Sequence, residues 1–201
     1  MRPALTRKRL AQAGIGAFFR PRDVRSLGVS FQALQHLVAV GDVAKVGRGL
    51  YRLQAIEPTE LETVAMVIAA VPKAIVCLLT ALRIHEIGTQ TPHVVWIALD
   101  RKNRVPVQLP AKTRLVRFSA AMLTYGVVRR SMLGVQVSIT SPARTVVDCF
   151  RYRNKVGLDV AMEALRDAVR SRKASVGAIW RTAEACRIRT VIGPYLDALS
   201  A

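Results

Sequence analysis

The order of apolar and polar positions near the start of the chain predicts two short helices followed by a hairpin. We expect the first helix over residues 22–27, a turn at Gly28 and a second helix with Ser30 as its N-cap. Gly47 and Gly49 mark the turn of the hairpin. The second helix carries apolar residues at the helical period, which are expected to form one buried stripe: Phe31, Leu34, Leu37 and Val38. This order of elements is typical of a winged helix-turn-helix.

Beyond Leu53 the pattern predicts a larger second domain, so the expected domains are residues 1–55 and residues 56–201. The predicted strands cover residues 93–99, 114–118, 126–130 and 135–139. The predicted helices cover residues 5–13, 61–71, 73–87, 142–150, 158–171, 175–186 and 191–199. Ile75 and Val76 also suit a strand. The expected fold class is α+β, with an N-terminal winged helix-turn-helix and a larger mixed α/β domain that holds a small sheet and several helices.

The net charge narrows the class of partner. The chain has 201 residues and a formal net charge of +18. Such a charge points to an anionic partner, with nucleic acid as the first candidate and an acidic protein or an anionic membrane surface as alternatives. A hydrophobic content of 51% is compatible with a folded core. The sequence predicts no membrane span and no signal peptide, so we expect a cytoplasmic protein.

The predicted head, residues 1–53, is the most direct candidate for contact with double-stranded DNA. It holds ten Lys or Arg and two acids, a balance expected of a surface that meets phosphates. Short and amide side chains at the beginning of a helix suit base edges, and cations on a wing suit phosphates. The alternative is that the same fold packs only against protein. The candidate DNA-binding residues are Arg20, Arg22, Arg25, Ser30, Phe31, Gln32, Gln35, His36, Lys45, Arg48 and Arg52.

A second basic patch is predicted in the strand region of the larger domain. Residues 101–155 hold twelve Lys or Arg and one acid, Asp148. This excess suits a second nucleic-acid contact or a dock for an acidic protein, and the simplest alternative is a solvated charged surface. The residues of this patch are Arg101, Lys102, Arg104, Lys112, Arg114, Arg117, Arg129 and Arg130.

The segment SPARTVVD, residues 141–148, places Arg144 and Asp148 four residues apart on one helix face. As a surface pair they would contribute only ~0.3–0.5 kcal/mol. Alternatively, Asp148 organises several arginines as a structural anchor. The three cysteines lack metal-ligand spacing and are expected to be buried free thiols: Cys77, Cys149 and Cys186. The histidines lack such spacing too, and we predict no metal and no cofactor.

An enzymatic alternative rests on Asp100 and Lys102, at the end of a predicted strand. With Glu86 as a further ligand, they resemble the carboxylate-x-lysine element of metal-dependent nucleases. Magnesium chemistry requires clustered carboxylates, whereas this segment supplies mainly bases. The pattern therefore favours a protein that is not an enzyme, with a nuclease-like or other nucleic-acid-processing activity as the alternative.

Several stretches in the same order resemble AbiEi-family antitoxins of type IV toxin-antitoxin systems over nearly the full length of the chain. They are LVAVGDVAKVGRGLYRL, CLLTALRIHEIG, a strand ending in IALD, SITSPARTVVDCF and AMEALRDAV. The resemblance implies a winged helix that binds inverted repeats in its own promoter and represses a two-gene operon. It also implies a C-terminal domain that opposes a nucleotidyltransferase-like toxin without requiring a stable complex. A dimer formed on the inverted repeat would follow from half-site reading.

Overall fold

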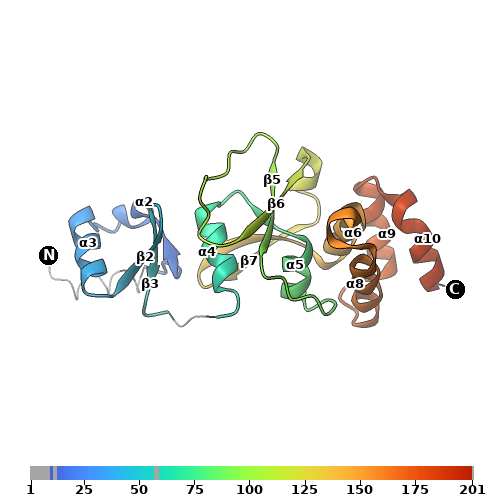
Figure 1. The fold of residues 1–201 in the computed structure, drawn as a ribbon, viewed down its shortest axis with the longest axis horizontal. Helices are drawn as coiled ribbons and strands as arrows, with labels where there is room; N and C mark the ends of the chain where they lie inside the picture. The colour runs from blue at the N-terminus through green and yellow to red at the C-terminus, as the bar shows by residue number, and fades with distance from the viewer. Residues whose placement is uncertain (1–9, 11–12, 57–58, 201) are drawn as a thin grey trace. The chain divides into compact units, whose positions relative to one another are not determined.

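The computed structural model describes residue 10, residues 13–56 and residues 59–200. It shows a mixed α+β protein with two small sheets and several helices, as predicted (Figure 1). The helix expected over residues 5–13 falls mostly outside the described residues. Two compact units are present: residues 1–72 with 105–111 and 130–137, and the remainder of the chain. The boundary that we predict after residue 55 falls inside the first unit, whose sequence is discontinuous.

The first unit is built around a three-stranded antiparallel sheet in the order β1-β3-β2. Its helices and strands are β1 (Phe18–Phe19), α2 (Pro21–Arg25), α3 (Phe31–Ala39), β2 (Val43–Gly47), β3 (Leu50–Leu53) and α4 (Glu62–Ala70). Pro21 occupies the first position of α2, where its missing N–H has no intrahelical acceptor to lose. Ser30 caps α3, since its Oγ accepts the backbone N–H of Ala33 at 3.1 Å. Gly28, with φ 73°, makes the turn between the two helices.

One prediction about α3 is wrong, because Phe31 does not belong to the buried stripe. Leu34 and Leu37 are each 1% exposed and pack with Val24 and Phe19, whereas the Phe31 side chain is 66% exposed. The buried arc of a nine-residue helix is centred on Leu34 and Leu37. Phe31 lies at the margin of that arc and at the first helical residue, where the core beneath the helix ends.

The second sheet has five strands in the order β6-β5-β4-β8-β7. These strands are β4 (Ile75–Val76), β5 (Val95–Asp100), β6 (Thr113–Phe118), β7 (Val127–Met132) and β8 (Val135–Thr140). The central strand β4 pairs in parallel with β8 and antiparallel with β5, while β5 runs parallel to β6. The helix expected from residue 73 therefore begins only at Leu78, because Ile75 and Val76 form the central strand instead.

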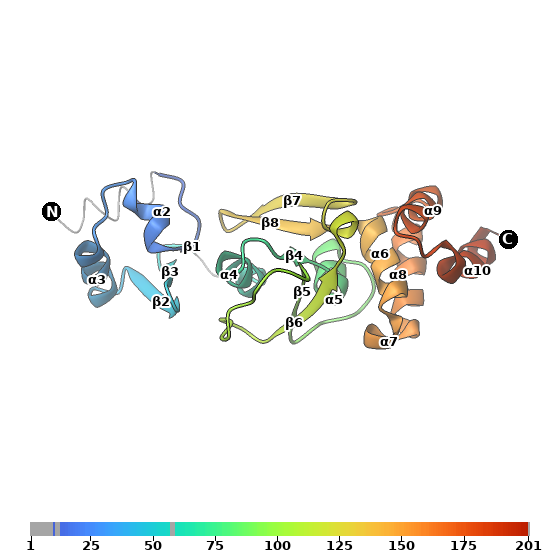
Figure 2. The same ribbon diagram turned by 90° about the horizontal axis from the view of Figure 1, so that it is seen from above.

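The C-terminal helices pack around α6, which lies beside α5, α8, α9 and α10 (Figure 2). Their bounds are α5 (Leu78–His85), α6 (Pro142–Arg151), α7 (Arg153–Val156), α8 (Leu158–Arg170), α9 (Val176–Ala185) and α10 (Arg189–Ser200). A short 3-10 helix, η1 (Ala120–Leu123), joins β6 to β7. Ser141 and Ser175 cap α6 and α9 as predicted. Among the described residues, none of the helices combines the length and apolarity that crossing a bilayer requires.

The Arg144–Asp148 pair is not on the surface, contrary to one of our two interpretations. Both side chains are fully buried, and Arg144 Nε donates to Asp148 Oδ1 at 2.9 Å. The same guanidinium donates to the carbonyl oxygens of Met122 and Tyr125 and lies over the ring of Phe118. The pair therefore anchors α6 to the segment around η1. The two carbonyl oxygens that accept from Arg144 lie about twenty residues before it in sequence.

Candidate nucleic-acid interface

The outward face of α3 carries the polar side chains that the sequence predicts there. Gln32, Gln35 and His36 are exposed, and Phe31 stands beside them. Ser30 is exposed as well, but its Oγ is engaged as the helix cap. Two amides and an imidazole on one turn and a half of helix can donate to and accept from base edges, so this face has the chemistry for reading a major groove.

Exposed cations flank this helix on both sides along the sequence. Arg22 and Arg25 lie in α2, before this helix. Lys45 and Arg48 lie in the hairpin of β2 and β3, after it. Arg22 lies 3.4 Å from Asp23, a contact made between two exposed side chains, which water screens. The structure thus places four of the six predicted phosphate-binding cations of the head at the surface.

The other two predicted cations, Arg20 and Arg52, hold the fold together instead. Arg52 is 8% exposed, and its Nε donates to Glu62 Oε1 at 2.7 Å. Its remaining N–H groups bond Leu53, Gln54 and Ile56. Arg52 lies on the hairpin, but as a candidate for phosphate contact it is corrected here, because its buried guanidinium ties β3 to the beginning of α4. Arg20 is half-buried and donates to the carbonyl oxygens of Ala69 and Ala70.

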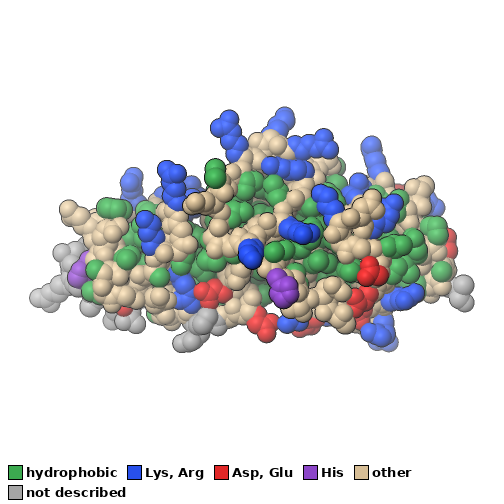
Figure 3. Space-filling model, in the orientation of Figure 1, with side chains coloured by type: hydrophobic (Ala, Val, Ile, Leu, Met, Phe, Trp, Pro, Cys, Tyr) green, Lys and Arg blue, Asp and Glu red, His purple; other side chains and the backbone are tan. Residues whose placement is uncertain are grey.

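The second basic patch is divided by the sheet order. Most of its residues lie on β6 or on the loop between β5 and β6, where Lys and Arg side chains gather (Figure 3). Arg129 and Arg130 lie on β7, the strand at the opposite edge of the sheet. Arg117 donates to the carbonyl oxygens of Asp100 and Asn103, and Arg114 lies over the Trp96 ring at 5.2 Å. The predicted patch is therefore divided between the two edges of the sheet. Two of its arginines, Arg114 and Arg117, also make contacts within the fold.

The carboxylates of the nuclease alternative are not brought together as a metal site. Asp100 Oδ1 accepts the backbone N–H of Lys102 at 2.8 Å, which closes the turn after β5. Glu86 Oε2 lies 3.1 Å from Lys173 Nζ. In the part of the chain that the structure describes, no three His, Cys, Asp or Glu side chains gather as metal ligands. These contacts give Asp100 and Glu86 local structural roles.

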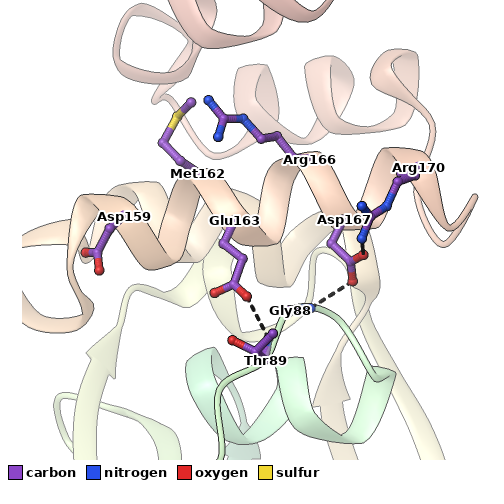
Figure 4. A pocket seen from close by; sticks show the side chains of 8 residues that line it. All are labelled: Gly88, Thr89, Asp159, Met162, Glu163, Arg166, Asp167 and Arg170. Carbon is purple, nitrogen blue, oxygen red and sulfur yellow. Dashed lines mark hydrogen bonds and ion pairs between the residues drawn. The ribbon is translucent and has the colours of Figure 1, made fainter.

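A pocket of about 440 Å³ on α8 contains carboxylates, and Figure 4 shows how they are used. Glu163 accepts the backbone N–H of Thr89, and Asp167 accepts that of Gly88, both at 2.8 Å. The Thr89 side chain, followed by Gln90 and the Thr89 backbone, lowers the pKa of Glu163, and the Gly88 N–H, followed by Arg170, lowers the pKa of Asp167. The pair thus fastens the turn after α5 to α8.

The cysteines and His85 lie inside the second unit. Cys77, Cys149 and Cys186 are free and buried, as predicted, and burial raises the pKa of each thiol. A protonated thiol is a poor nucleophile and a poor metal ligand. His85 is also buried, with Nε2 at 2.7 Å from the carbonyl oxygen of Thr140. These groups have the environment of a packed core.

Fold and surface together define a mixed α+β protein in which α3 has a polar outward face and exposed cations precede and follow it in sequence. Residues 8–54 match the model of a family described as a transcriptional regulator, AbiEi antitoxin. This match confirms the predicted resemblance to AbiEi-family antitoxins for that stretch and supports a regulatory antitoxin role. The description is that of a transcriptional regulator.

Comparison with known proteins adds a likeness of fold. No curated protein sequence matches the chain. The crystal structure of the RV2827C protein from Mycobacterium tuberculosis is similar with a TM-score of 0.51 and 16% sequence identity. The likeness covers 76% of this chain and 59% of that chain, so this chain corresponds to little more than half of that protein. At this identity the likeness concerns the fold alone.

Proposed function

We propose that the protein is a winged helix-turn-helix repressor that binds double-stranded DNA and autoregulates a toxin-antitoxin operon. The observation that carries the proposal is that the family match at residues 8–54 coincides with the exposed amide face of α3 and its flanking cations. In this proposal residues 1–55 bind DNA. Residues 56–201 act as the antitoxin against a nucleotidyltransferase-like toxin, without a stable complex being needed.

The proposed mode of binding follows from the surface of the head. The N-terminal part of α3 enters the major groove, where Gln32, Gln35 and His36 meet base edges. Arg25, which precedes the helix in sequence, and Arg48, which follows it, contact phosphates and fix its position on the duplex. One copy reads one half-site, so an inverted repeat is bound by two copies, which need not associate before they meet the DNA.

Binding is tested by titrating the full chain with a duplex from upstream of its own gene and with random DNA. Gln35→Ala is expected to reduce the discrimination between them by about 1–3 kcal/mol, the value of a bidentate amide contact to a base. Arg48→Ala is expected to weaken both complexes. It should also reduce the slope of log affinity against log salt concentration by about 1, the value for one lost phosphate contact.

Arg52→Ala is the matched control for Arg48→Ala, since both residues lie in or beside the same hairpin. We expect it to lower the free energy of unfolding and to leave the salt slope unchanged, because its guanidinium binds Glu62. If the wild-type protein has equal, negligible affinity for both duplexes at moderate ionic strength, the proposal fails.

The antitoxin half of the proposal is tested by a growth assay with the toxin encoded beside this gene. Residues 54–201 alone are expected to restore growth as well as the full chain does, since the proposal assigns neutralisation to this part. Solubility and circular dichroism of the fragment serve as the control for folding. A folded, expressed fragment that gives no rescue would reject this division of labour.

A further inference from the structure

Phe31 is an exposed aromatic side chain on the face of α3 that we propose to read DNA. Its side chain is 66% exposed, more than that of any other aromatic residue among the large exposed apolar residues of the described chain. Exposure of a phenyl ring to water is unfavourable, because burial in an apolar core would lower its free energy. The core beneath α3 is nevertheless formed by Leu34 and Leu37, and the phenyl ring does not join it.

The position of Phe31 in the helix sets the direction of its ring. It is the first residue of α3, and helical side chains lean toward the N-terminus of their helix. The ring therefore projects over the N-terminal end, the part that penetrates furthest into a groove in the proposed mode. Gln35 follows four residues later, one turn along the same side of the helix. An apolar ring and a bidentate amide are thus neighbours on one exposed surface.

An A·T base pair presents a matching pair of groups in the major groove. Adenine offers an acceptor at N7 and a donor at N6, and thymine carries a methyl group at C5. Gln is suited to the adenine edge, and an apolar side chain is suited to the thymine methyl. A G·C pair offers no methyl group, and the cytosine amino group would lose its hydrogen bonds to water beside a phenyl ring.

We infer that Phe31 and Gln35 together make the protein selective for A·T pairs in its half-site, with Phe31 in contact with the thymine methyl. The inference rests on the proposed DNA-binding function and specifies what that site recognises. The exposed cations that precede and follow α3 in sequence, such as Arg25 and Arg48, favour a polyanion over a second apolar protein surface as the occupant of this face.

The test removes the methyl group without changing any hydrogen bond. After footprinting locates the half-sites upstream of the gene, thymines are replaced one at a time by deoxyuracil, and affinities are measured by fluorescence anisotropy at fixed salt. Wild-type protein is expected to lose about fourfold in affinity at one or two positions per half-site, the value of burying one methyl-sized group. Phe31→Ala is expected to bind the thymine and deoxyuracil duplexes equally.

Val40→Ala is the matched control, since Val40 is the exposed apolar residue at the other end of α3, with a side chain that is 54% exposed. It is expected to keep the wild-type preference for thymine.

Two outcomes overturn the inference but leave the proposed DNA binding intact. One is equal affinity of the wild-type protein for thymine and deoxyuracil duplexes, and the other is a preference for thymine that persists in Phe31→Ala. The inference is also overturned if Phe31→Ala has a different oligomeric state from the wild type in the absence of DNA. Phe31 would then lie between two protein copies. Absence of any specific binding by the wild type overturns the proposed function itself.

Discussion

At the scale of single residues, the fate of each arginine depends on which acceptors surround it. Arg144 is fully buried because one carboxylate and two backbone carbonyl oxygens accept its N–H groups. Arg48 is exposed on the same protein, a few residues from a buried Arg52. The i, i+4 spacing of Arg144 and Asp148 predicts their pairing, but their burial depends on Met122 and Tyr125, which no local pattern connects to α6. The sequence therefore predicts the pair and leaves its depth undetermined.

Removing one partner of the buried pair is expected to destabilise the protein strongly. Asp148→Ala leaves the Arg144 guanidinium buried without its counter-charge, which costs about 3–5 kcal/mol. Arg170→Ala is the control, because it breaks an exposed pair with Asp167 in which Arg170 is 84% exposed. That change should alter the free energy of unfolding by less than ~1 kcal/mol. Urea denaturation of both variants measures the difference, and similar values for the two would contradict the anchor.

The same carboxyl group predicts a pH dependence of stability. Burial raises the pKa of Asp148 from its ordinary value of 3.8 to about 6, although Arg144 opposes the shift. Asp148 Oδ2 is buried without a hydrogen-bond partner among the described residues, which agrees with incomplete solvation of the charge. The folded state therefore binds this proton more tightly than the unfolded state does.

As pH rises from about 4 to about 6, ionisation of Asp148 should lower the free energy of unfolding, by roughly 3 kcal/mol at most. Glu163 and Asp167 act in the opposite direction and at lower pH, below their ordinary pKa values of 4.5 and 3.8, since their pKa values are lowered in the fold. Comparing wild type with Asp148→Asn at several pH values isolates the effect of Asp148, because the other two carboxyl groups are common to both. Parallel stability curves for the two proteins would contradict the raised pKa.

At the scale of elements, the sequence predicts those whose signals are local. The caps at Ser30, Ser141 and Ser175 and the hairpin of β7 and β8 are confirmed. At β4 the sequence leaves helix and strand open, and the two β-branched residues form the central strand because β5 and β8 supply partners on both sides. The outward face of α3 is predicted well except for Phe31, since periodicity cannot tell where the core under a helix ends.

A close approach of two glycines in the first unit depends on elements far apart in sequence. A Cβ on Gly16 would lie 2.6 Å from the backbone carbon of Gly134, and Ala17 N–H donates to Leu133 O in the same place. Gly16→Ala should therefore force the backbone segments apart and cost about 1–3 kcal/mol. The control is Gly47→Ala, whose nearest contact would be an ordinary 3.8 Å and which should change stability by about 0.5 kcal/mol or less. Chemical denaturation tests this, and equal stability of the two variants would mean that the contact adapts freely.

At the scale of the whole molecule, the described residues include two apolar clusters that share no residue. One contains residues between Leu10 and Leu53, and the other contains residues between Ile75 and Leu196. The order of predicted elements indicates two domains, but it does not indicate that residues 105–111 and 130–137 join the first compact unit. For residues 130–137 that assignment follows from non-local contacts, such as the hydrogen bond from the Ala17 N–H to the Leu133 carbonyl oxygen. Sequence periodicity carries no information about such contacts.

Separate cores predict that damage to one is local. Leu37 and Leu165 are each buried in a different core, and truncation to Ala should cost about 2–5 kcal/mol at either site. Hydrogen exchange resolves where the cost falls, because each amide reports the opening of its own region. Leu37→Ala should speed exchange in α3, β2 and β3 and leave α8 protected as in the wild type, while Leu165→Ala should do the reverse. Because both truncations remove the same number of atoms, each variant is the control for the other. If either one lowers protection equally in both regions, the two cores unfold as one cooperative unit. The head then cannot be treated as a module whose proposed DNA binding is separable from the rest of the chain.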